Sequence, residues 1–534
     1  MRIGLDFDNT LACYDKVFPF VARNMGLLPG NWSGGKADIR TFMRNQPQGE
    51  TYWQRLQGQV YGKYMNRAVL YPEVANFLLR LKAKGDEAFI VSHKTEFGHC
   101  DPEQVPLRRE ALRWMQANRF FDSAGFGLAE SNVFFENTRE AKVKKIADLE
   151  CDLFIDDLWE VFAEQHFPLN TKKILFGSST EGQKAAPCEL ISKSWREIAQ
   201  HVFGTQEEEE VRAQIEFALG DVVDSTLAIE GRANSRVFMV NSREEAFAIK
   251  FYPDVTNDVR DRLGAERSAS EFLNSHGVKS TVEVVSAVRD LNIGVYRWVE
   301  GVNVSSIRNS DIEQALEFIE QLHNIRHAPN ATAISNASEA CLREEDIWNQ
   351  IAYKRSNLNI VTKRSPDLEK YLLSEFDPLF AELSRLTIKR FPKRSRLARL
   401  PKKDRTLSPS DFGFHNAIRK EDGSLVWIDF EYFGWDDPVK LISDFIWHPG
   451  FSLSAAQTRR WKTGCLEIFA GDKDLTERFL QRFPLYGLRW CLILLNIFFR
   501  PESDSESRGR IQLEKARTLL GTVEKAVVDA DITT

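Results

Sequence analysis

The chain has 534 residues, of which 43% are hydrophobic and 28% charged, and its formal net charge is −6. This length predicts about two to four domains, and the mild acidity lacks the basic excess typical of proteins that bind nucleic acid or anionic membranes. Seven cysteines without a C-x-x-C pair predict reduced thiols in a cytoplasmic protein.

Neither the N-terminus nor the most apolar segment predicts a membrane protein. The N-terminus reaches Asp6 after only five residues, so it does not resemble a secretory leader. The longest apolar run, residues 491–499, is too short to cross a bilayer. We therefore expect a buried helix there and no membrane insertion.

The first part of the chain alternates short apolar strands with helix-patterned segments. Strands are predicted at residues 2–7, 88–92 and 153–157, with helices at 74–84 and 108–117 between them. This alternation predicts an α/β domain with a doubly wound, Rossmann-like parallel sheet over residues 1–203.

Four consecutive glutamates, residues 207–210, mark a change in composition. Such a run repels itself and is usually solvated, either as a linker or as the acidic first turn of a helix. Both interpretations place a domain boundary near residue 205, and we expect an acidic linker at 204–214.

After this boundary the order of elements changes. Strand-like segments come first, at 238–240, 246–251 and 294–299, and long helical segments follow, such as 312–322 and 510–528. The pattern predicts a bilobal α+β domain over 215–534, with a small lobe at about 215–300 and a large lobe at about 301–534.

Carboxylates follow two strands of the predicted parallel sheet. Asp6 and Asp8 come after the first strand, and Asp156 and Asp157 end the third. Because ligands bind at the carboxyl ends of parallel strands, we expect these groups to converge. Mg²⁺ would neutralise them and bridge to phosphate. One carboxylate can then attack phosphorus while another protonates the leaving oxygen.

Two further residue types suit phosphate chemistry at this edge. Ser92 ends the second strand and can donate to a phosphoryl oxygen, and a lysine before the third strand can neutralise the transferring group. The candidate lysines are Lys142, Lys144 and Lys145.

With Asp6, Asp8 and Thr10 completing D-x-D-x-T, this set resembles the haloacid dehalogenase superfamily. The resemblance implies a nucleophilic Asp6 that forms an aspartyl-phosphate and an acid/base Asp8. It also implies a small helical cap at about 12–86 that selects a phosphorylated metabolite. The implied phosphate-binding residues are Thr10, Ser92 and Lys142, with Lys145 as second choice for the lysine. The implied metal ligands are Asp6, Asp8, Asp156 and Asp157.

The second constellation lies near residue 411. Asp411 is followed after four residues by Asn416, and a strand at 425–428 then ends in Asp429. Phosphoryl transfer needs a carboxylate for the attacking hydroxyl, oxygen ligands for Mg²⁺ and a cation on the nucleotide phosphates. Asp411 suits the first role, and Asn416 and Asp429 suit the second. Lys250, inside an apolar strand, suits the third and needs a partner, for which Glu266 is preferred over Glu271.

This order resembles the aminoglycoside phosphotransferase and choline kinase family, relatives of the protein kinases, over roughly residues 215–500. The resemblance implies ATP as phosphoryl donor and Mg²⁺ as cofactor. It places adenine at a hinge containing Trp298 and Glu300, and the phosphates under a turn containing Asn234 and Ser235.

The chain departs from the family at one place. The family often has His-Gly before its catalytic aspartate, where this chain has Pro409-Ser410, and His415 lies too late to replace that histidine. We interpret His323 as a packed helix residue, and Trp435, Trp447 and Trp461 as core or substrate wall. The basic segment 389–405 is interpreted as a solvated loop, ahead of a site for an anionic acceptor.

Together these patterns predict a bifunctional phosphate enzyme. Its C-terminal domain would phosphorylate a small hydroxylated acceptor such as a sugar, an amino alcohol or an aminoglycoside-like compound, and its N-terminal domain would hydrolyse a phosphoester. The alternatives are a kinase with an inert or regulatory first domain, and a nucleotide-binding scaffold without turnover. The sequence contains neither a P-loop nor a basic tract along which a nucleic-acid backbone could bind, so it does not predict a nucleic-acid substrate.

Overall fold

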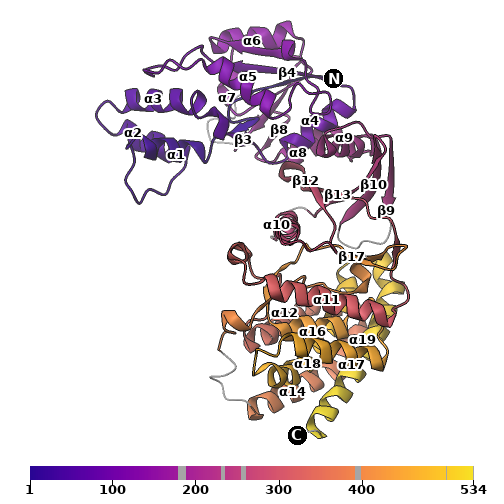
Figure 1. The fold of residues 1–534 in the computed structure, drawn as a ribbon. Coiled ribbons are helices and arrows are strands. Elements are labelled where there is room, and N and C mark those ends of the chain that lie inside the picture. Colours follow the sequence, from indigo (N-terminus) through magenta and orange to yellow (C-terminus); the bar gives the residue numbers. More distant parts are fainter. Residues whose placement is uncertain (179–187, 230–234, 254–259, 391–397, 501, 533–534) are drawn as a thin grey trace. The chain divides into compact units, whose positions relative to one another are not determined.

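The computed structural model describes residues 1–178, 188–229, 235–253, 260–390, 398–500 and 502–532 (Figure 1). The chain forms two compact units. The first comprises Met1–Tyr252 and Ser286–Val295, and the second comprises Pro253–Val285 and Tyr296–Thr534. Most strands of the expected small lobe therefore group with the first unit, although the sequence places them in a separate domain.

A parallel six-stranded sheet forms the centre of the first unit, in the order β5-β4-β1-β6-β7-β8. The strands are β5 (Val133–Glu136), β4 (Glu87–His93), β1 (Arg2–Leu5), β6 (Leu153–Asp156), β7 (Lys172–Phe176) and β8 (Leu190–Ser192). All five adjacent pairs run parallel. The predicted parallel sheet is thus confirmed, and β1 lies between the two strands that carry the other candidate site residues.

Helices cover both faces of this sheet because successive strand residues point to opposite sides. One hydrophobic cluster joins the sheet to α4 (Val74–Ala83), α5 (Leu107–Ala117) and α8 (Trp195–Phe203). A second cluster, on the other face, joins it to α6 (Arg139–Asp148) and α7 (Trp159–Phe162). This two-sided burial explains the continuous apolar strands in the sequence.

Three helices lie between β1 and α4, where we expected a cap. They are α1 (Val17–Asn24), α2 (Lys36–Arg44) and α3 (Gly49–Tyr61). Trp53 on α3 is buried and stacks on Phe18 of α1, with ring centroids 5.4 Å apart. Trp53 therefore packs this helical group instead of facing a site.

Helix α9 (Glu208–Leu219) occupies most of the segment expected to be an acidic linker. Three of its glutamates lie in the first turn, where the helix dipole favours negative charge. Glu210 is buried and pairs with the buried Arg80 of α4 at 3.1 Å. The Arg80 guanidinium also donates to the carbonyl oxygen of Gly204 at 2.9 Å. This ion pair fixes α9 on the first unit, so the segment is an ordered helix and not a solvated linker.

The second sheet of the chain has the order β12-β13-β11-β10-β9. Its strands are β9 (Ser225–Ile229), β10 (Arg236–Ser242), β11 (Glu245–Phe251), β12 (Val284–Val288) and β13 (Ile293–Arg297). Strand β10 pairs antiparallel with both β11 and β9. The strand-rich segment predicted after residue 215 is therefore present.

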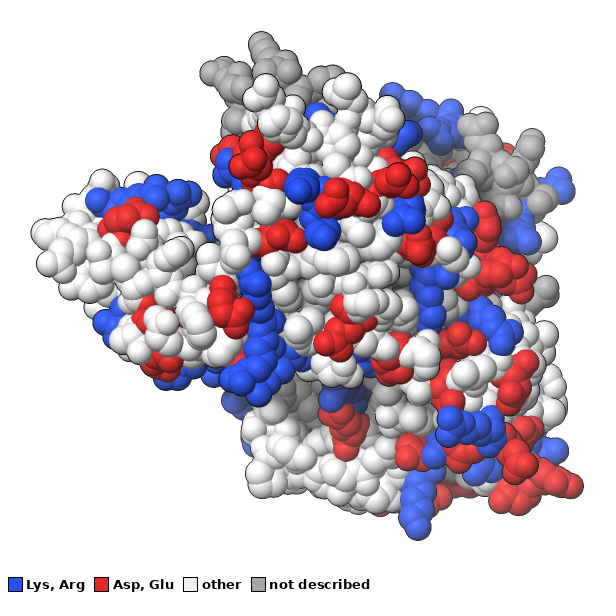
Figure 2. Space-filling model, turned by 90° about the horizontal axis from the view of Figure 1, so that it is seen from above, with Lys and Arg blue, Asp and Glu red and all other residues white. Residues whose placement is uncertain are grey.

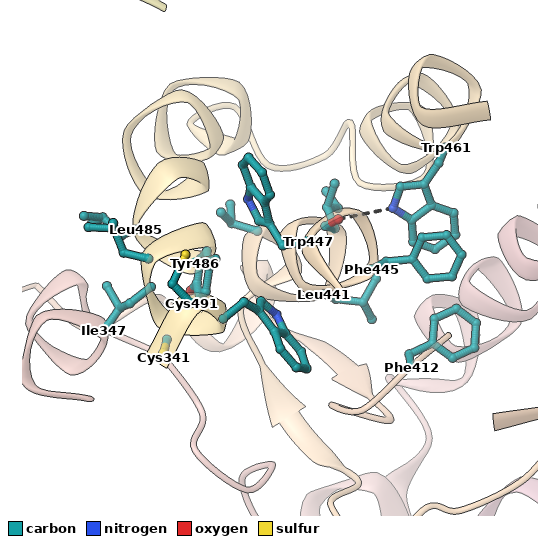
Figure 3. Packing of buried hydrophobic residues seen from close by; sticks show 14 of the residues in the cluster. Cys341, Ile347, Phe412, Leu441, Phe445, Trp447, Trp461, Leu485, Tyr486 and Cys491 are labelled. Carbon is teal, nitrogen blue, oxygen red and sulfur yellow. Dashed lines mark hydrogen bonds between the residues drawn. The ribbon is translucent and has the colours of Figure 1, made fainter. Parts of the chain in front are cut away.

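The second unit is mainly helical, as predicted. Its principal helices are α10 (Arg262–Ser275), α11 (Asn309–Ile325), α12 (Glu344–Thr362), α14 (Asp377–Arg390), α16 (Pro438–Trp447), α17 (Ala455–Ile468), α18 (Leu475–Leu494) and α19 (Glu502–Ile532). They surround one large apolar core that includes Trp447 and Trp461 (Figure 3). The indole N–H of Trp461 donates to the carbonyl oxygen of Ile442 at 3.3 Å, so both tryptophans are core residues.

One stretch, Leu475–Phe499, is long and apolar enough to cross a membrane by length and composition alone, and 61% of its apolar window is buried inside the unit. Its buried Arg489 pairs with Asp444 at 3.2 Å. Both features are typical of the core helix of a globular domain.

Breaking the Arg80–Glu210 pair is expected to destabilise the first unit. Removing one partner of a buried ion pair leaves the other charge uncompensated, at a cost of about 3 kcal/mol. We therefore expect Glu210→Ala to lower the midpoint of the corresponding calorimetric transition. The matched control is Glu209→Ala, because Glu209 is exposed in the same helical turn. Equal effects of the two substitutions would contradict the structural role of Glu210.

Candidate functional site

The loop from Asp411 to Asn416 lies between β15 (Thr406–Ser408) and β16 (Ala417–Arg419) of the second unit. Phe412 and Phe414 are buried in the core. The ring centroid of Phe412 lies 5.5 Å from that of Phe445 and 6.1 Å from that of Trp461 (Figure 3). These contacts anchor the backbone, so the intervening polar residues are held at defined positions.

A short hairpin brings Asn416 close to Asp429. Strand β16 pairs antiparallel with β17 (Leu425–Trp427), and the Ile428 amide donates to the Asn416 carbonyl oxygen at 3.0 Å. The Asn416 side-chain amide donates to the Asp411 carbonyl oxygen, also at 3.0 Å. The structure therefore brings Asp411, Asn416 and Asp429 together.

Asp429 belongs to a carboxylate cluster with Glu266 and Glu431, whose ligand oxygens lie within 4.8 Å of one another. Glu266 also accepts a hydrogen bond from the Phe430 amide at 3.3 Å, and Glu431 pairs with the buried Arg262. Hard oxygen ligands at this spacing fit Mg²⁺. The sequence identified Asp429 and Glu266 but not Glu431, which lies two residues after Asp429.

Two residues beside these carboxylates have left-handed backbones. The φ angle is 68° at Ser410 and 70° at Asp429. Such conformations cost non-glycine residues of the order of 1–3 kcal/mol and cluster at functional sites. The surrounding core and hydrogen bonds must therefore hold both residues in place.

The Asp411 carboxylate lies beside two imidazoles. Its Oδ1 atom is 3.3 Å from Nε2 of His415 and 3.3 Å from Nε2 of His448. Burial opposes ionisation of Asp411, but contact with the two histidines outweighs burial and holds its pKa well below the usual range. No sequence pattern indicated His448, which lies 37 residues away, directly after α16 (Pro438–Trp447).

The remaining predicted nucleotide residues belong to different parts of the chain. Lys250 is buried on β11 in the first unit, whereas Glu266 lies in the second, so their pairing stays a prediction. Ser235 is half-buried before β10. Asn234 lies outside the described residues.

Trp298 and Glu300 line a cavity of about 760 Å³ in the second unit, together with Thr281, Val282 and Val426. Seven of its twelve lining residues are charged: Lys279, Glu283, Arg297, Glu300, Lys420, Glu421 and Asp422. The binding of adenine beside Trp298 and Glu300 stays a prediction.

In the first unit, the carboxyl ends of β1, β6 and β4 meet as predicted. The Lys142 ammonium donates to Asp6 Oδ1 and to Asp156 Oδ2, both at 2.6 Å. Burial opposes the charge on Lys142, but the two carboxylates outweigh burial and raise its pKa. This geometry favours Lys142 over Lys145, whose ammonium instead lies over the Phe134 ring.

Thr10 and Asp157 complete this cluster. The Thr10 hydroxyl donates to Asp6 Oδ2 at 3.1 Å and lies 3.5 Å from Asp157 Oδ1. Ser92 is buried near the end of β4. Ligand oxygens of Asp6, Asp156 and Asp157 lie within 4.8 Å of one another. Burial, followed by the neighbouring carboxylates, raises the pKa of Asp157 to about 8.

The pKa of Asp6 is raised as well. Burial raises its pKa to about 7, although Lys142 acts against this shift. Burial is the main cause of the raised pKa values of Asp6 and Asp157, and the neighbouring carboxylates act in the same direction, so the ionised cluster favours additional positive charge. A divalent cation would supply the missing charge, so the residues fit the predicted Mg²⁺.

Asp8 does not belong to that carboxylate cluster. Its carboxylate pairs with Lys94 at 2.8 Å and accepts a hydrogen bond from the Tyr14 hydroxyl at 2.6 Å. A second lysine, Lys36 on α2, donates to Asn9 Oδ1 at 2.9 Å and to the Tyr61 hydroxyl at 3.1 Å. The sequence identified neither lysine, although Lys94 follows Ser92 by only two residues.

Lys, Arg, Asp and Glu are interspersed on the face seen in Figure 2. Of the basic segment 389–405, residues 391–397 lie outside the described residues, and Arg399, Lys402 and Lys403 are exposed. His323 is half-buried on α11 and packs edge-on against Phe469 at 4.9 Å, as expected for a packed helix residue.

Residues 225–462, which make up less than half of the chain, match the model of the phosphotransferase enzyme family. This match supports the predicted kinase-like fold for that segment. It does not extend to the parallel sheet of the first unit. A search of curated proteins gave no match.

Several solved kinases resemble part of the chain. One is a spectinomycin phosphotransferase in complex with ADP and spectinomycin, with 12% identity, a TM-score of 0.39, and coverage of 60% of this chain and 99% of that one. Another is choline kinase from Cryptosporidium parvum Iowa II, with 12% identity, a TM-score of 0.41, and coverage of 58% and 91%. A third is an ethanolamine kinase from Plasmodium vivax, with 14% identity, a TM-score of 0.39, and coverage of 64% and 95%. These scores are too low to carry an argument, so the kinase assignment rests on the family match.

The raised pKa values of Asp6 and Asp157 predict a pH-dependent stability of the metal-free protein. Between about pH 4 and pH 8 the folded state binds more protons than the unfolded state, so stability falls as pH rises and levels off above that range. Calorimetry in a chelator should show this decline for the first unit. Asp157→Asn should make it shallower, and Mg²⁺ should stabilise the protein most at high pH. An unchanged slope in the variant would contradict the assignment.

Proposed function

We propose that the segment matching the phosphotransferase family transfers the γ-phosphoryl group of ATP to a hydroxyl group of a small metabolite. The observation that carries this proposal is the grouping of Asp411, Asn416 and Asp429 on one anchored loop and hairpin. Asp429 has two further carboxylates beside it, and carboxylate oxygens are ligands that Mg²⁺ prefers.

In this proposal Asp411 accepts the hydrogen bond of the acceptor hydroxyl and takes its proton as the oxygen attacks phosphorus. The bond between the γ-phosphorus and the bridging oxygen breaks, and ADP leaves with the bond's electron pair. The low pKa of Asp411 keeps it ionised at neutral pH, so it orients the hydroxyl and takes the proton late in the reaction. Asn416, Asp429 and Glu431 would hold Mg²⁺, which supplies charge neutralisation at the phosphates.

The acceptor is proposed at the level of its chemistry: a small hydroxylated compound such as a sugar, an amino alcohol or an aminoglycoside-like molecule. Solved kinases that resemble this segment bear names that include choline, ethanolamine and spectinomycin. Since 34% of the Asp411 side chain is exposed, an acceptor hydroxyl can reach it. We place this reaction in the cytoplasm.

For the first unit we propose a phosphoester hydrolase of the haloacid dehalogenase type. The observation that favours it is Lys142 held between Asp6 and Asp156. Asp6 would attack phosphorus and form an aspartyl-phosphate while the alkoxide leaving group takes a proton from Asp8, and water would then cleave the acyl phosphate. Asp8 needs a proton for the first step, and the Tyr14 hydroxyl and Lys94 lie in contact with it.

Two alternatives predict different experimental outcomes. A kinase whose first unit is inert or regulatory would transfer phosphate from ATP but would not hydrolyse phosphoesters. A nucleotide-binding scaffold would bind MgATP without any turnover.

For the kinase, Asp411→Asn is expected to lower phosphoryl transfer by about 10²- to 10⁴-fold, because general-base catalysis contributes about that much. The measurement is ADP formation with Mg²⁺ against a panel of sugars and amino alcohols. Asp367→Asn is the matched control, since Asp367 is exposed on α13 (Pro366–Tyr371). Equal rates for the wild type and Asp411→Asn would contradict the assignment.

For the first unit, the wild type is expected to hydrolyse p-nitrophenyl phosphate with Mg²⁺, and Asp6→Asn to abolish this activity, because an amide cannot form the acyl phosphate. Asp148→Asn serves as control, since Asp148 is exposed at the end of α6. Hydrolysis that persists in Asp6→Asn would exclude the aspartyl-phosphate route. Loss of activity in both variants would also count against it.

A further inference from the structure

Side chains of α16 and of the residue after it contact Asp411 and its neighbour Ser410. Ser410, immediately before Asp411, contacts α16 through the ammonium group of the buried Lys440, which donates to Ser410 Oγ at 2.9 Å. His448 follows the last residue of α16 and its Nε2 lies 3.3 Å from Asp411 Oδ1. The two contacts therefore come from α16 and from the residue that directly follows it.

Hydrogen bonding indicates where the proton of His448 resides. The Gly450 amide donates to His448 Nδ1 at 3.0 Å. A ring nitrogen that accepts this bond carries no proton, so the neutral imidazole has its N–H at Nε2. Nε2 is also the His448 atom that lies 3.3 Å from Asp411 Oδ1.

The ring of His448 has little freedom to turn away. It stacks on His415, with centroids 3.9 Å apart and planes inclined by 7°, and it meets Trp490 edge-on at 4.6 Å. The Trp490 indole N–H donates to Asp444 Oδ1 at 2.9 Å. Asp444 in turn pairs with Lys440 at 3.3 Å, so the support of His448 and the support of Ser410 share one buried network.

We propose that His448 is a positioning residue, whose Nε2–H fixes one oxygen of the Asp411 carboxylate and leaves the other for the acceptor hydroxyl. This inference rests on the proposed kinase function and adds a residue to it. His448 thereby supplies, from a distant part of the chain, an orienting group for a loop in which Pro409 and Ser410 stand before the aspartate. His415 Nε2 lies at the same distance from Asp411 Oδ1, but, unlike His448, His415 has no hydrogen bond at Nδ1 among the described residues that would fix its tautomer.

A metal ion bound by Asp411, His415 and His448 is the competing explanation, since their ligand atoms lie within 4.8 Å of one another. The stacked rings argue against it. An imidazole binds metal through a lone pair in its own plane, and an ion in the plane of one ring lies outside the nearly parallel plane of the other. A hydrogen bond from one ring needs no such convergence.

The experiment compares His448→Leu and His448→Gln, with His323→Leu as the matched control on α11. Phosphate release from MgATP, with water as acceptor, gives kcat and KM without knowledge of the natural acceptor. We expect His448→Leu to lower kcat by about a hundredfold with the KM for ATP unchanged, as for a misplaced catalytic group. His448→Gln, which keeps an N–H donor, should recover most of the rate. His323→Leu should match the wild type.

A second readout does not depend on turnover. Burial lowers the pKa of His448, and contact with Asp411 acts in the opposite direction. The exchange of the imidazole C2 hydrogen, followed by mass spectrometry, should therefore report a lower pKa for His448 in Asp411→Asn than in the wild type.

Several results would overturn the inference. One is an unchanged kcat in His448→Leu while Asp411→Asn is impaired, and another is no rescue by glutamine. A third is an unchanged exchange rate in Asp411→Asn. Tight binding of added Zn²⁺ that depends on both histidines would establish the metal site instead. Failure of the wild type to bind or hydrolyse MgATP would be recognised separately, because it would refute the proposed kinase itself.

Discussion

The candidate kinase site depends on two buried phenylalanines that alternate with its polar residues. Phe412 and Phe414 insert into the helical core of the second unit, so the backbone between Asp411 and Asn416 can take only one path. The β16–β17 hairpin then places Asp429 beside that path. Packing thus positions the carboxylates and the amide before any ligand binds, which is the preorganisation that phosphoryl transfer requires.

Buried charges complete the positioning in both units, and each is stable only with its partners. Lys440 lies between Asp436 and Asp444 and reaches Ser410, whereas Lys142 lies between Asp6 and Asp156. In each case a lysine from a helix fixes groups at the end of a strand or loop. The left-handed backbone of Ser410 is held by the same contacts. The two sites therefore share a physical design although their folds differ.

The sequence predicted what is encoded locally. Apolar strands ending in carboxylates predicted the parallel sheet, and the spacing of Asp411, Asn416 and Asp429 predicted a group that the structure brings together. It did not predict contacts created by tertiary packing. His448 contacts Asp411 only because α16 ends beside the loop. Lys36 contacts Asn9, beside the first site, from a separate helix. For the acidic run the sequence left a linker and the acidic first turn of a helix open. The structure has the helix, and Glu210 pairs with Arg80 across a helix interface, a tertiary contact that the sequence pattern does not encode.

We infer that Asp429 and its neighbours form a magnesium-dependent nucleotide site. The decisive measurement is calorimetric titration with the non-hydrolysable analogue AMP-PNP, with and without Mg²⁺. We expect binding that Mg²⁺ strengthens in the wild type and a loss of that strengthening in Asp429→Asn. Absence of binding, or an equal effect of Mg²⁺ in both proteins, would mean that these residues do not form such a site.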